Sequence, residues 1–462
     1  MVLPRTTTPS PGTSSQMSAG GTSMLVAGAA STIALSLVFQ MYVLATLGAG
    51  IQSDAFYAAS ALPLFMNAVF CDPLAFVIVP LLAKCRPNTF WKDAWTIIHG
   101  ITALFALIAV GVYLIIPFVT PLILPGFGST GLALATEMST ILILGTFFAA
   151  IGIGARSVAH ASGSFLWPTL CSVLGSLVGL VWLFWSFPRI GIVAGAWGMT
   201  LRMGVETALL LAGLRAYTLP DPRSAVFHGI FAATWPLWVG NLYFRSDIVL
   251  DRALSSMAPP GAMSVFLLAQ QALGGITQVL NRGAAAPLLP QLSRLARDTE
   301  WVHFTKTYSA YSQRLFLCLV GLLMTVLLIG KHILTISFQF SHVSASDVVL
   351  LWILLLLLAG LLLGDPISYV CSSAFYALGN TRTPTRIAAA AFTLSVVLKL
   401  GGFRVAGIYG LALATSGSYL VRMWLLARAL HSAITEERLQ TACDRSVAAN
   451  GMRSYGVALN QH

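Results

Sequence analysis

Long apolar runs separated by short polar segments fill the chain from about residue 24 to about residue 428. Many runs have 18 or more mostly apolar residues, the length that a helix needs to cross about 30 Å of hydrocarbon. They are apolar on every face, unlike the amphipathic helices that cover a soluble core. Strands of a membrane barrel would instead alternate over about ten residues. The pattern therefore predicts an all-α polytopic membrane protein.

The runs predict about twelve transmembrane helices. The expected ranges are 24–47, 56–83, 95–117, 132–155, 164–187, 191–215, 228–252, 262–290, 310–330, 347–376, 384–401 and 405–428. Residues 1–22 are rich in Ser, Thr, Pro and Gly, which predicts a disordered cytoplasmic tail rather than a targeting peptide. Residues 23–220 and 221–431 are expected to form two six-helix halves, and 432–462 a second cytoplasmic tail.

Composition supports a membrane protein and excludes several other classes. Charged residues make up 9% of the chain and hydrophobic residues 57%, whereas soluble domains carry charge at about a quarter of their positions. The net charge of +11 is explained by basic cytoplasmic loops, so no nucleic-acid partner is predicted. The six cysteines show no paired spacing, and no nucleotide, metal or catalytic motif is present. No cofactor, no metal site and no enzyme activity are expected.

Loops that are rich in Lys and Arg alternate along the chain with loops that contain few of them. Rich loops follow the even-numbered spans, with Lys84, Arg86, Lys92, Arg156, Arg215, Arg223, Arg294, Arg297, Lys306, Arg382, Arg386, Arg428 and Arg438. The other loops carry only Arg189, Lys331, Lys399 and Arg404. Because cytoplasmic loops hold the excess of Lys and Arg, both termini are predicted to be cytoplasmic in a bacterial inner membrane.

Two segments of the first half recur in the second. FVIVPLLAKCR resembles AAPLLPQLSRLAR, which places Pro80 opposite Pro290. AHASGSFLWPTL resembles AFYALGNTRTPTRI, which places Pro168 opposite Pro384. The two offsets agree, at about 210 and about 216 residues. We therefore expect two pseudo-symmetric halves related about the membrane normal, with a substrate path between them.

Charged residues inside the predicted spans are candidate functional groups, because a charge in the membrane usually faces a polar cavity or an opposite charge. The seventh span contains Arg245, Asp247, Asp251 and Arg252. Asp247 and Asp251 lie four residues apart and so share one face of a helix. We expect Asp251 and Arg252 to lie in a solvated interfacial turn, and Arg245 and Asp247 to lie deeper and to bind substrate.

Other spans add further candidates. Arg202 and Glu206, four residues apart, are expected to neutralise each other. Arg282 has no nearby acid, and its guanidinium matches phosphate oxygens, although snorkelling toward an interface explains it equally well. Asp72 and Asp365 each precede a proline inside a span, where they could cap a broken helix or bind a ligand.

Transport energy is expected to come from an ion gradient, the membrane potential or consumption of the product, since no nucleotide motif is present. Four carboxylates could carry a coupling ion: Glu137, Glu206, Asp247 and Asp365. The sequence does not choose among them.

Several segments together resemble the MurJ/MviN-type lipid II flippases of the multidrug/oligosaccharidyl-lipid/polysaccharide (MOP) exporter superfamily. They are TLGAGIQSDAFYAASALPLFMNAVF, VIVPLLAK, VLDRALSS, PPGAMSVFLLAQQALGGITQVLNRGAAAPLLPQLSRLA and AFYALGNTRTPTRIA. The resemblance implies a V-shaped bundle that opens alternately to either side. It also implies a polyprenyl-pyrophosphate-linked oligosaccharide as substrate, carried across the inner membrane.

This chain departs from the family at its cationic positions. The first span has no arginine, Asn67 and Gln271 stand where the resemblance places arginines, and Tyr369 stands where it places a lysine. Asp54 and Asp72 match acidic positions of the family. For Asp54 we favour an N-cap at the outer end of the second span over substrate contact. The two additional C-terminal helices of typical lipid II flippases are also missing.

These departures favour export of a lipid-linked exopolysaccharide or O-antigen repeat unit, with Arg282, Arg245 and Arg202 supplying the positive charge. The resemblance also implies membrane lipids, a polysaccharide polymerase and an export apparatus as partners. Three alternatives remain open: lipid II flipping for peptidoglycan synthesis, a non-transporting scaffold derived from a flippase, and a cation-coupled drug exporter.

Overall fold

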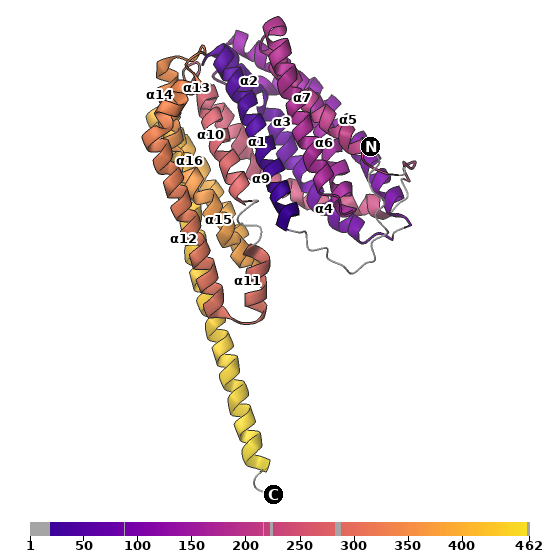
Figure 1. Cartoon of the computed structure of the whole chain (residues 1–462), viewed down its shortest axis with the longest axis vertical. Coiled ribbons are helices and arrows are strands. Elements are labelled where there is room, and N and C mark those ends of the chain that lie inside the picture. The colour runs from indigo at the N-terminus through magenta and orange to yellow at the C-terminus, as the bar shows by residue number, and fades with distance from the viewer. Residues whose placement is uncertain (1–18, 87, 216, 222–224, 282–287, 460–462) are drawn as a thin grey trace.

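The computed structural model describes residues 19–459 except 87, 216, 222–224 and 282–287, and every regular element in this part of the chain is a helix (Figure 1). Two short segments are π-helical, η1 (Asn67–Cys71) and η3 (Val326–Gly330). The α-helices are α1 (Ala19–Leu47), α2 (Ile51–Ala59), α3 (Ala61–Met66), α4 (Asp72–Ala83), α5 (Phe90–Ile123), α6 (Ser129–Ala161), α7 (Leu166–Ile190), α8 (Val193–Ala212), α9 (Ala225–Ser256), α10 (Ala262–Leu280), α11 (Leu288–Arg297), α12 (Trp301–Thr325), α13 (Lys331–Ser337), α14 (Ala345–Leu357), α15 (Ala359–Ala377) and α16 (Arg382–Leu459).

The predicted spans can all be located in these helices. Nine helical stretches of the described residues are long and apolar enough to cross a membrane. One of them, Arg382–Leu439, contains two predicted spans, because non-helical backbone at Ala406 and Gly407 divides α16. The predicted sixth and seventh spans correspond to α8 and α9, which carry several charged residues. The all-α polytopic fold is confirmed.

Some boundaries differ from those expected. The second span begins at Ile51 and changes from α-helix to a π-helical turn at η1 before α4. In the eighth, the described helices are α10 and α11, and residues 282–287 between them lie outside the described part of the chain. Residues 19–22, expected in the disordered tail, belong to α1. Helix propagation explains this extension, because each residue added to an existing helix gains one backbone hydrogen bond. Residues 1–18 lie outside the described part of the chain.

The internal repeat appears as two matched turns. Between α6 and α7, Gly163 has φ +84°, and Ser164 N donates to Ala159 O at 2.9 Å. Between α15 and α16, Gly379 has φ +73°, and Asn380 N donates to Phe375 O at 3.0 Å. Both are helix-ending turns in which glycine adopts a left-handed conformation. Each pair of equivalent positions is separated by 216 residues, the offset predicted from the prolines.

A second pair of turns keeps the same spacing. Gly191, between α7 and α8, has φ +59°, and Gly407, at the kink of α16, has φ +55°. These positions are again 216 residues apart. The helix pair α7–α8 is therefore repeated by the two parts of α16, and the pseudo-symmetric arrangement extends over at least this helix pair.

The helices form two groups that lie side by side and are joined near one end (Figure 1). Helices α1–α8 make up the first group, and α10–α16 the second, from which the C-terminal part of α16 projects. Helix α9 contacts both groups. Near its middle, Trp238 Nε1 donates to Phe70 O in η1 at 3.0 Å. One turn later, the Tyr243 hydroxyl lies 2.7 Å from Thr393 Oγ1 in α16.

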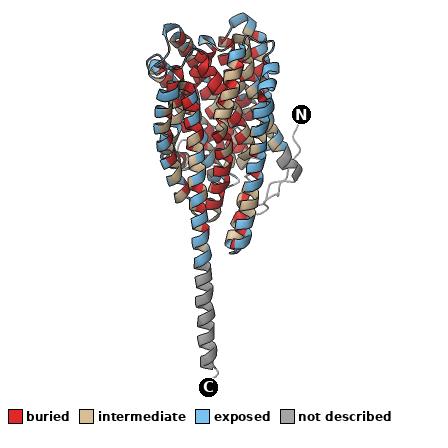
Figure 2. Cartoon of the chain, turned by 90° about the vertical axis from the view of Figure 1, so that its left-hand side faces the viewer, coloured by how far each residue is buried: buried red, intermediate tan, exposed pale blue. Residues whose placement is uncertain are grey.

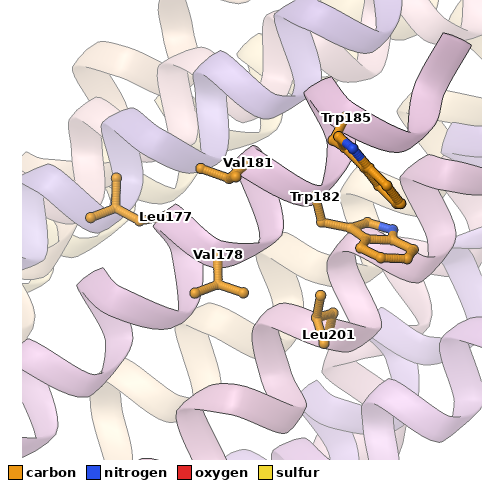
Figure 3. A pocket seen from close by; sticks show the side chains of 6 residues that line it. All are labelled: Leu177, Val178, Val181, Trp182, Trp185 and Leu201. Atoms are coloured by element: carbon orange, nitrogen blue, oxygen red, sulfur yellow. The ribbon is translucent and has the colours of Figure 1, made fainter.

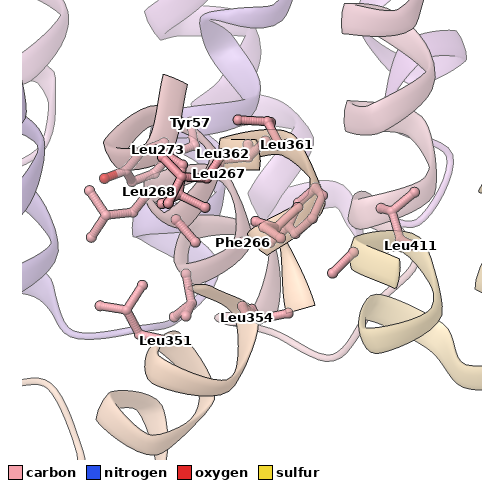
Figure 4. Close-up of a cluster of buried hydrophobic side chains, with 14 of the residues drawn as sticks. Tyr57, Phe266, Leu267, Leu268, Leu273, Leu351, Leu354, Leu361, Leu362 and Leu411 are labelled. Atoms are coloured by element: carbon pink, nitrogen blue, oxygen red, sulfur yellow. The ribbon is translucent and has the colours of Figure 1, made fainter. Parts of the chain in front are cut away.

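Buried side chains gather along the centre of the bundle, toward the end opposite the projecting helix (Figure 2). One hydrophobic cluster there is continuous across both groups. Tyr57 of α2 lies with Phe266 of α10, Leu354 of α14 and Leu411 of α16 in this cluster (Figure 4). Helices in a membrane associate through close packing rather than through exclusion of water. The groups therefore fit together tightly at this end.

Candidate functional site

Asp54 connects the two groups of helices. It lies in the first turn of α2 and is 4% exposed. Its Oδ2 accepts a hydrogen bond from Gly261 N at 2.6 Å, and its Oδ1 accepts one from Ser264 N at 2.7 Å. Gly261 is the N-cap residue of α10. The carboxylate therefore occupies the N-terminus of a helix in the other group, where backbone N–H groups and the helix dipole stabilise negative charge.

This contact corrects the expected role of Asp54. We predicted that it caps its own helix, but it caps α10. The start of α2 is served by Ser53 instead, whose hydroxyl accepts a hydrogen bond from Gly50 N at 2.9 Å. The local pattern of an acid in a first turn fits either role. Only the tertiary arrangement decides which helix the carboxylate caps.

Other polar contacts between the groups lie at the same end. Ser53 Oγ donates to Ser264 Oγ at 3.2 Å, and Gly126 N donates to Ser256 Oγ at 3.3 Å. From the α13–α14 connection, His342 N donates to Ala45 O in the last turn of α1 at 2.8 Å. We call these contacts, together with the two bonds of Asp54, the clamp. Among the described residues, the other side-chain contacts of this kind between residues 1–220 and 221–462 are made by Asp221 and by Trp238 of α9.

A buried lysine lies at the centre of a second polar cluster, inside the second group. Lys399 of α16 is 1% exposed. Its ammonium is 2.6 Å from Asp247 Oδ1 and 2.7 Å from Asp251 Oδ1, both on α9. Gln270 Nε2 of α10 donates to Asp251 Oδ2 at 3.0 Å. We call Lys399, Asp247, Asp251 and Gln270 the lysine cluster; it ties α9, α10 and α16 together.

Two sequence expectations for this region were wrong. Asp251 is 5% exposed rather than solvated, because Lys399 and Gln270 compensate its burial. Lys399 was assigned to a loop, but it lies within α16. Arg245, expected to lie deeper in the span than Asp251 and to bind substrate, has an exposed side chain, and its depth in the membrane stays a prediction. Asp247 and Asp251 do share one face as predicted, and a lysine inside an apolar span was the signal that could have identified their partner.

A third polar cluster lies within the first group. Arg156 of α6 forms an ion pair with Glu206 of α8, and Ser172 Oγ of α7 donates to the same carboxylate oxygen at 2.7 Å. Arg202 Nη1 donates to Ser36 Oγ of α1 at 3.3 Å. The expected Arg202–Glu206 pair is therefore wrong, and so is the assignment of Arg156 to a loop. An interhelical partner replaces the partner four residues away.

A double-mutant cycle tests this pairing. Arg156→Gln and Glu206→Gln are expected to be coupled by about 1–3 kcal/mol, because each single change leaves a partly buried charge without its counter-ion. Arg202→Gln combined with Glu206→Gln is the matched control and should be coupled by no more than about 0.5 kcal/mol, the value typical of residues four apart on a helix. Unfolding of the purified variants in detergent measures both. Stronger coupling in the control pair than in the Arg156 pair would contradict the structure.

The remaining sequence candidates are dispersed. Asp365 Oδ2 accepts a hydrogen bond from Asn281 Nδ2 at 3.0 Å, linking α15 to the end of α10. Asp72 begins α4 directly after the π-helical turn and is exposed. Asn67 and Gln271 are both half-buried. Arg282, the arginine predicted to meet phosphate, lies outside the described residues.

The sequence and fold can be compared with known proteins. The profile of the family described as lipid II flippase MurJ matches residues 43–452. The chain belongs to the MurJ family. It is 21% identical over 421 residues to a probable lipid II flippase MurJ of Vibrio cholerae, covering 86% of this chain and 80% of that protein. A Buchnera aphidicola protein with the same description is 20% identical over 398 residues, covering 83% of this chain and 77% of that protein.

Solved structures share the fold. A lipid II flippase MurJ in an inward closed conformation has a TM-score of 0.74 and 16% identity, covering 89% of each chain. An inward-facing multidrug resistance MATE family transporter of the MOP superfamily has a TM-score of 0.73 and 15% identity, covering 87% of this chain and 99% of the other. The MOP exporter-like fold is confirmed, and the chain belongs to a transporter family rather than an enzyme family.

Proposed function

We propose that this MurJ-family protein is a flippase that moves a lipid-linked sugar across the bacterial inner membrane, with lipid II as its first candidate substrate. The observation that carries the proposal is the family match, which extends through both groups of helices. The relatives above are described as lipid II flippases. They therefore support the lipid II alternative better than the exopolysaccharide reading that we favoured from the missing arginines.

The structure suggests how such a flippase would open. The clamp joins the two groups through a small number of hydrogen bonds at one end. The prediction that basic loops are cytoplasmic assigns the clamp to the periplasmic side. The similarity to an inward-facing MATE transporter, with a TM-score of 0.73 against 0.59 for an outward-facing one, supports this orientation of the opening. Breaking the clamp would then expose the path to the periplasm.

Substrate recognition would differ from the pattern that the resemblance implies. Asn67 and Gln271 can donate hydrogen bonds to phosphate oxygens but carry no charge. Arg202 is a half-buried cation that donates a hydrogen bond to Ser36 of the first helix. We therefore propose Arg202, Asn67 and Gln271 as substrate contacts, and Arg245 as a contact at the exposed face of α9.

The coupling ion is also constrained by the side-chain contacts. Asp247 is paired with Lys399, Glu206 with Arg156, and Asp365 accepts from Asn281. A carboxylate that already has a protein cation binds a free metal cation poorly. We therefore propose that Glu206 and Asp247 stabilise the helices and do not carry a transported metal ion. Asp365 and the exposed Glu137 are the remaining carboxylates for that role.

Export of an exopolysaccharide or O-antigen repeat unit is the second candidate function. The uncharged Asn67 and Gln271 favour it, because a cavity with fewer cations suits a substrate recognised mainly through its sugars. A polysaccharide polymerase and an export apparatus would be the partners in this case.

Depletion in the source bacterium separates the candidates. If the protein flips lipid II, cells should lyse and accumulate lipid II on the cytoplasmic side, whereas an exopolysaccharide exporter should lose surface polysaccharide without lysis. A strain carrying a second lipid II flippase is the control, since it should survive depletion. Loss of neither product would overturn the flippase proposal in favour of a scaffold, and increased sensitivity to cationic drugs would favour a drug exporter.

A further inference from the structure

Two arginines at the start of α16 form a basic surface with no carboxylate partner among the described residues. Arg382 and Arg386 lie four residues apart, on one face of the helix, and both are exposed. Together with Thr381 and Thr385 they line an open cavity of about 340 Å³. The two guanidinium groups are hydrogen-bond donors suited to an anionic oxygen group, whereas the Thr385 hydroxyl already donates to Thr381 O at 2.9 Å.

The fold of the turn does not require these arginines. Asn380 already caps the start of α16, since its Oδ1 accepts a hydrogen bond from Thr383 N at 3.1 Å. The matched turn before α7 has the same left-handed glycine and the same backbone hydrogen bond. At the two positions equivalent to Arg382 and Arg386, 216 residues earlier, it carries Leu166 and Leu170. One backbone therefore supports either leucines or arginines.

Leu166 and Leu170 indicate the surroundings of the equivalent helix face on α7. Leu166 and Leu170 are 41% and 44% exposed. They begin a stripe of exposed apolar side chains that runs along α7 through Leu174 and Val181 to Trp185. A large apolar surface of this kind on a membrane helix faces lipid. A shallow groove on the same part of α7 and on α8 is also apolar (Figure 3), lined by Leu177, Val178, Val181, Trp182, Trp185 and Leu201.

Helix α16 has a similar stripe of exposed apolar side chains, which lies C-terminal to the two arginines. Leu394, Val397 and Leu400 are 38%, 62% and 44% exposed. From Arg386 to the kink at Ala406 the helix rises by about 30 Å at about 1.5 Å per residue, which equals the thickness of the hydrocarbon layer. The arginines therefore lie where the lipid-facing stripe ends, at the depth of the headgroups.

We propose that Arg382 and Arg386, in the cavity that Thr381 and Thr385 also line, bind the phosphate of an anionic phospholipid. Charge complementarity identifies the partner, because two unneutralised arginines at headgroup depth attract a lipid with a net negative charge. On the orientation proposed above, this lipid belongs to the cytoplasmic leaflet. The site would hold the α15–α16 turn at the membrane surface, and it is separate from the substrate path.

Lipid titration of the purified full-length protein in detergent tests the site. Short-chain phosphatidylglycerol should bind Arg382→Gln/Arg386→Gln about 30-fold more weakly than wild type, since each basic side chain near an anionic surface contributes roughly fivefold. The matched control is Arg294→Gln/Arg297→Gln in α11, which removes the same charge from two other exposed arginines. The control should keep its affinity within about twofold.

Three outcomes would overturn the proposal. Equal loss of binding in both double variants would show general charge attraction rather than a site. Equal binding of phosphatidylcholine and phosphatidylglycerol by wild type would exclude recognition of net charge. Competition by inorganic phosphate as strong as that by phosphatidylglycerol would identify a free phosphate as the ligand. None of these measurements depends on transport, so failure of the flippase proposal would be seen separately.

Discussion

Replacing Asp54 with alanine is expected to shift the protein toward a state that is open at the clamp end. The change leaves Gly261 N and Ser264 N buried without acceptors, at about 1–3 kcal/mol each. These same two bonds cap α10, and loss of a helix cap alone costs about 0.5–2 kcal/mol. A loss of roughly 3 kcal/mol would change the ratio of closed to open states by about 100-fold. Asp54→Asn should have a smaller effect, because the amide keeps one acceptor oxygen.

Two spin labels report the opening directly. Labels replacing Ala45 and His342, whose backbones are joined by a 2.8 Å hydrogen bond, should separate in Asp54→Ala when distances are measured in detergent or lipid. The labelled protein needs a background without its native cysteines. Transport should fall as well, since a flippase must close at each end in turn.

Asp347 provides the matched control. It also caps a helix at this end of the bundle, α14, through Ser344. Its bonds lie within the second group only, so Asp347→Ala removes a cap without touching the clamp. Label distances in Asp347→Ala should stay those of wild type. An unchanged distance distribution in Asp54→Ala would show that the carboxylate does not hold the two groups together.

Hydropathy and turn residues were sufficient to predict the fold. The apolar runs gave twelve spans, because hydrocarbon thickness fixes the length of a crossing helix. The offset between Pro168 and Pro384, from which the repeat was predicted, is also the spacing of the matched turns at Gly163 and Gly379. These features depend on local sequence, so a single chain displays them.

Partners across helices could not be predicted in the same way. The pairing of Arg202 with Glu206 followed from their spacing, but such a pair contributes only about 0.2–0.5 kcal/mol to an isolated helix. A cation on a neighbouring helix can provide a better-oriented contact, and here Arg156 does so. Likewise, the rotation of α2 that points Asp54 at α10 depends on packing between the groups. Hydropathy gives no information on that rotation.

Replacing Lys399 with methionine is expected to destabilise the protein by about 3–5 kcal/mol, because it leaves Asp251 and much of Asp247 buried without their cation. The variant should unfold at a markedly lower temperature in detergent and accumulate poorly in membranes. Lys331→Met is the matched control: Lys331 is exposed, and its replacement should change stability by less than about 0.5 kcal/mol.

Neutralising the acids together with the lysine distinguishes a missing charge partner from a missing side chain. In Lys399→Met/Asp247→Asn/Asp251→Asn no buried charge of the lysine cluster remains, and most of the lost stability should return, because a buried ion pair contributes little beyond compensating its own desolvation. The double variant Asp247→Asn/Asp251→Asn should be as unstable as Lys399→Met, since it leaves the ammonium unpaired.

If the triple variant folds and still transports, the lysine cluster supports the helices only. If it folds without transporting, the ion pairs that join α9 to α16 also take part in the conformational change. Equal stability of Lys399→Met and wild type would show that the lysine does not neutralise these carboxylates.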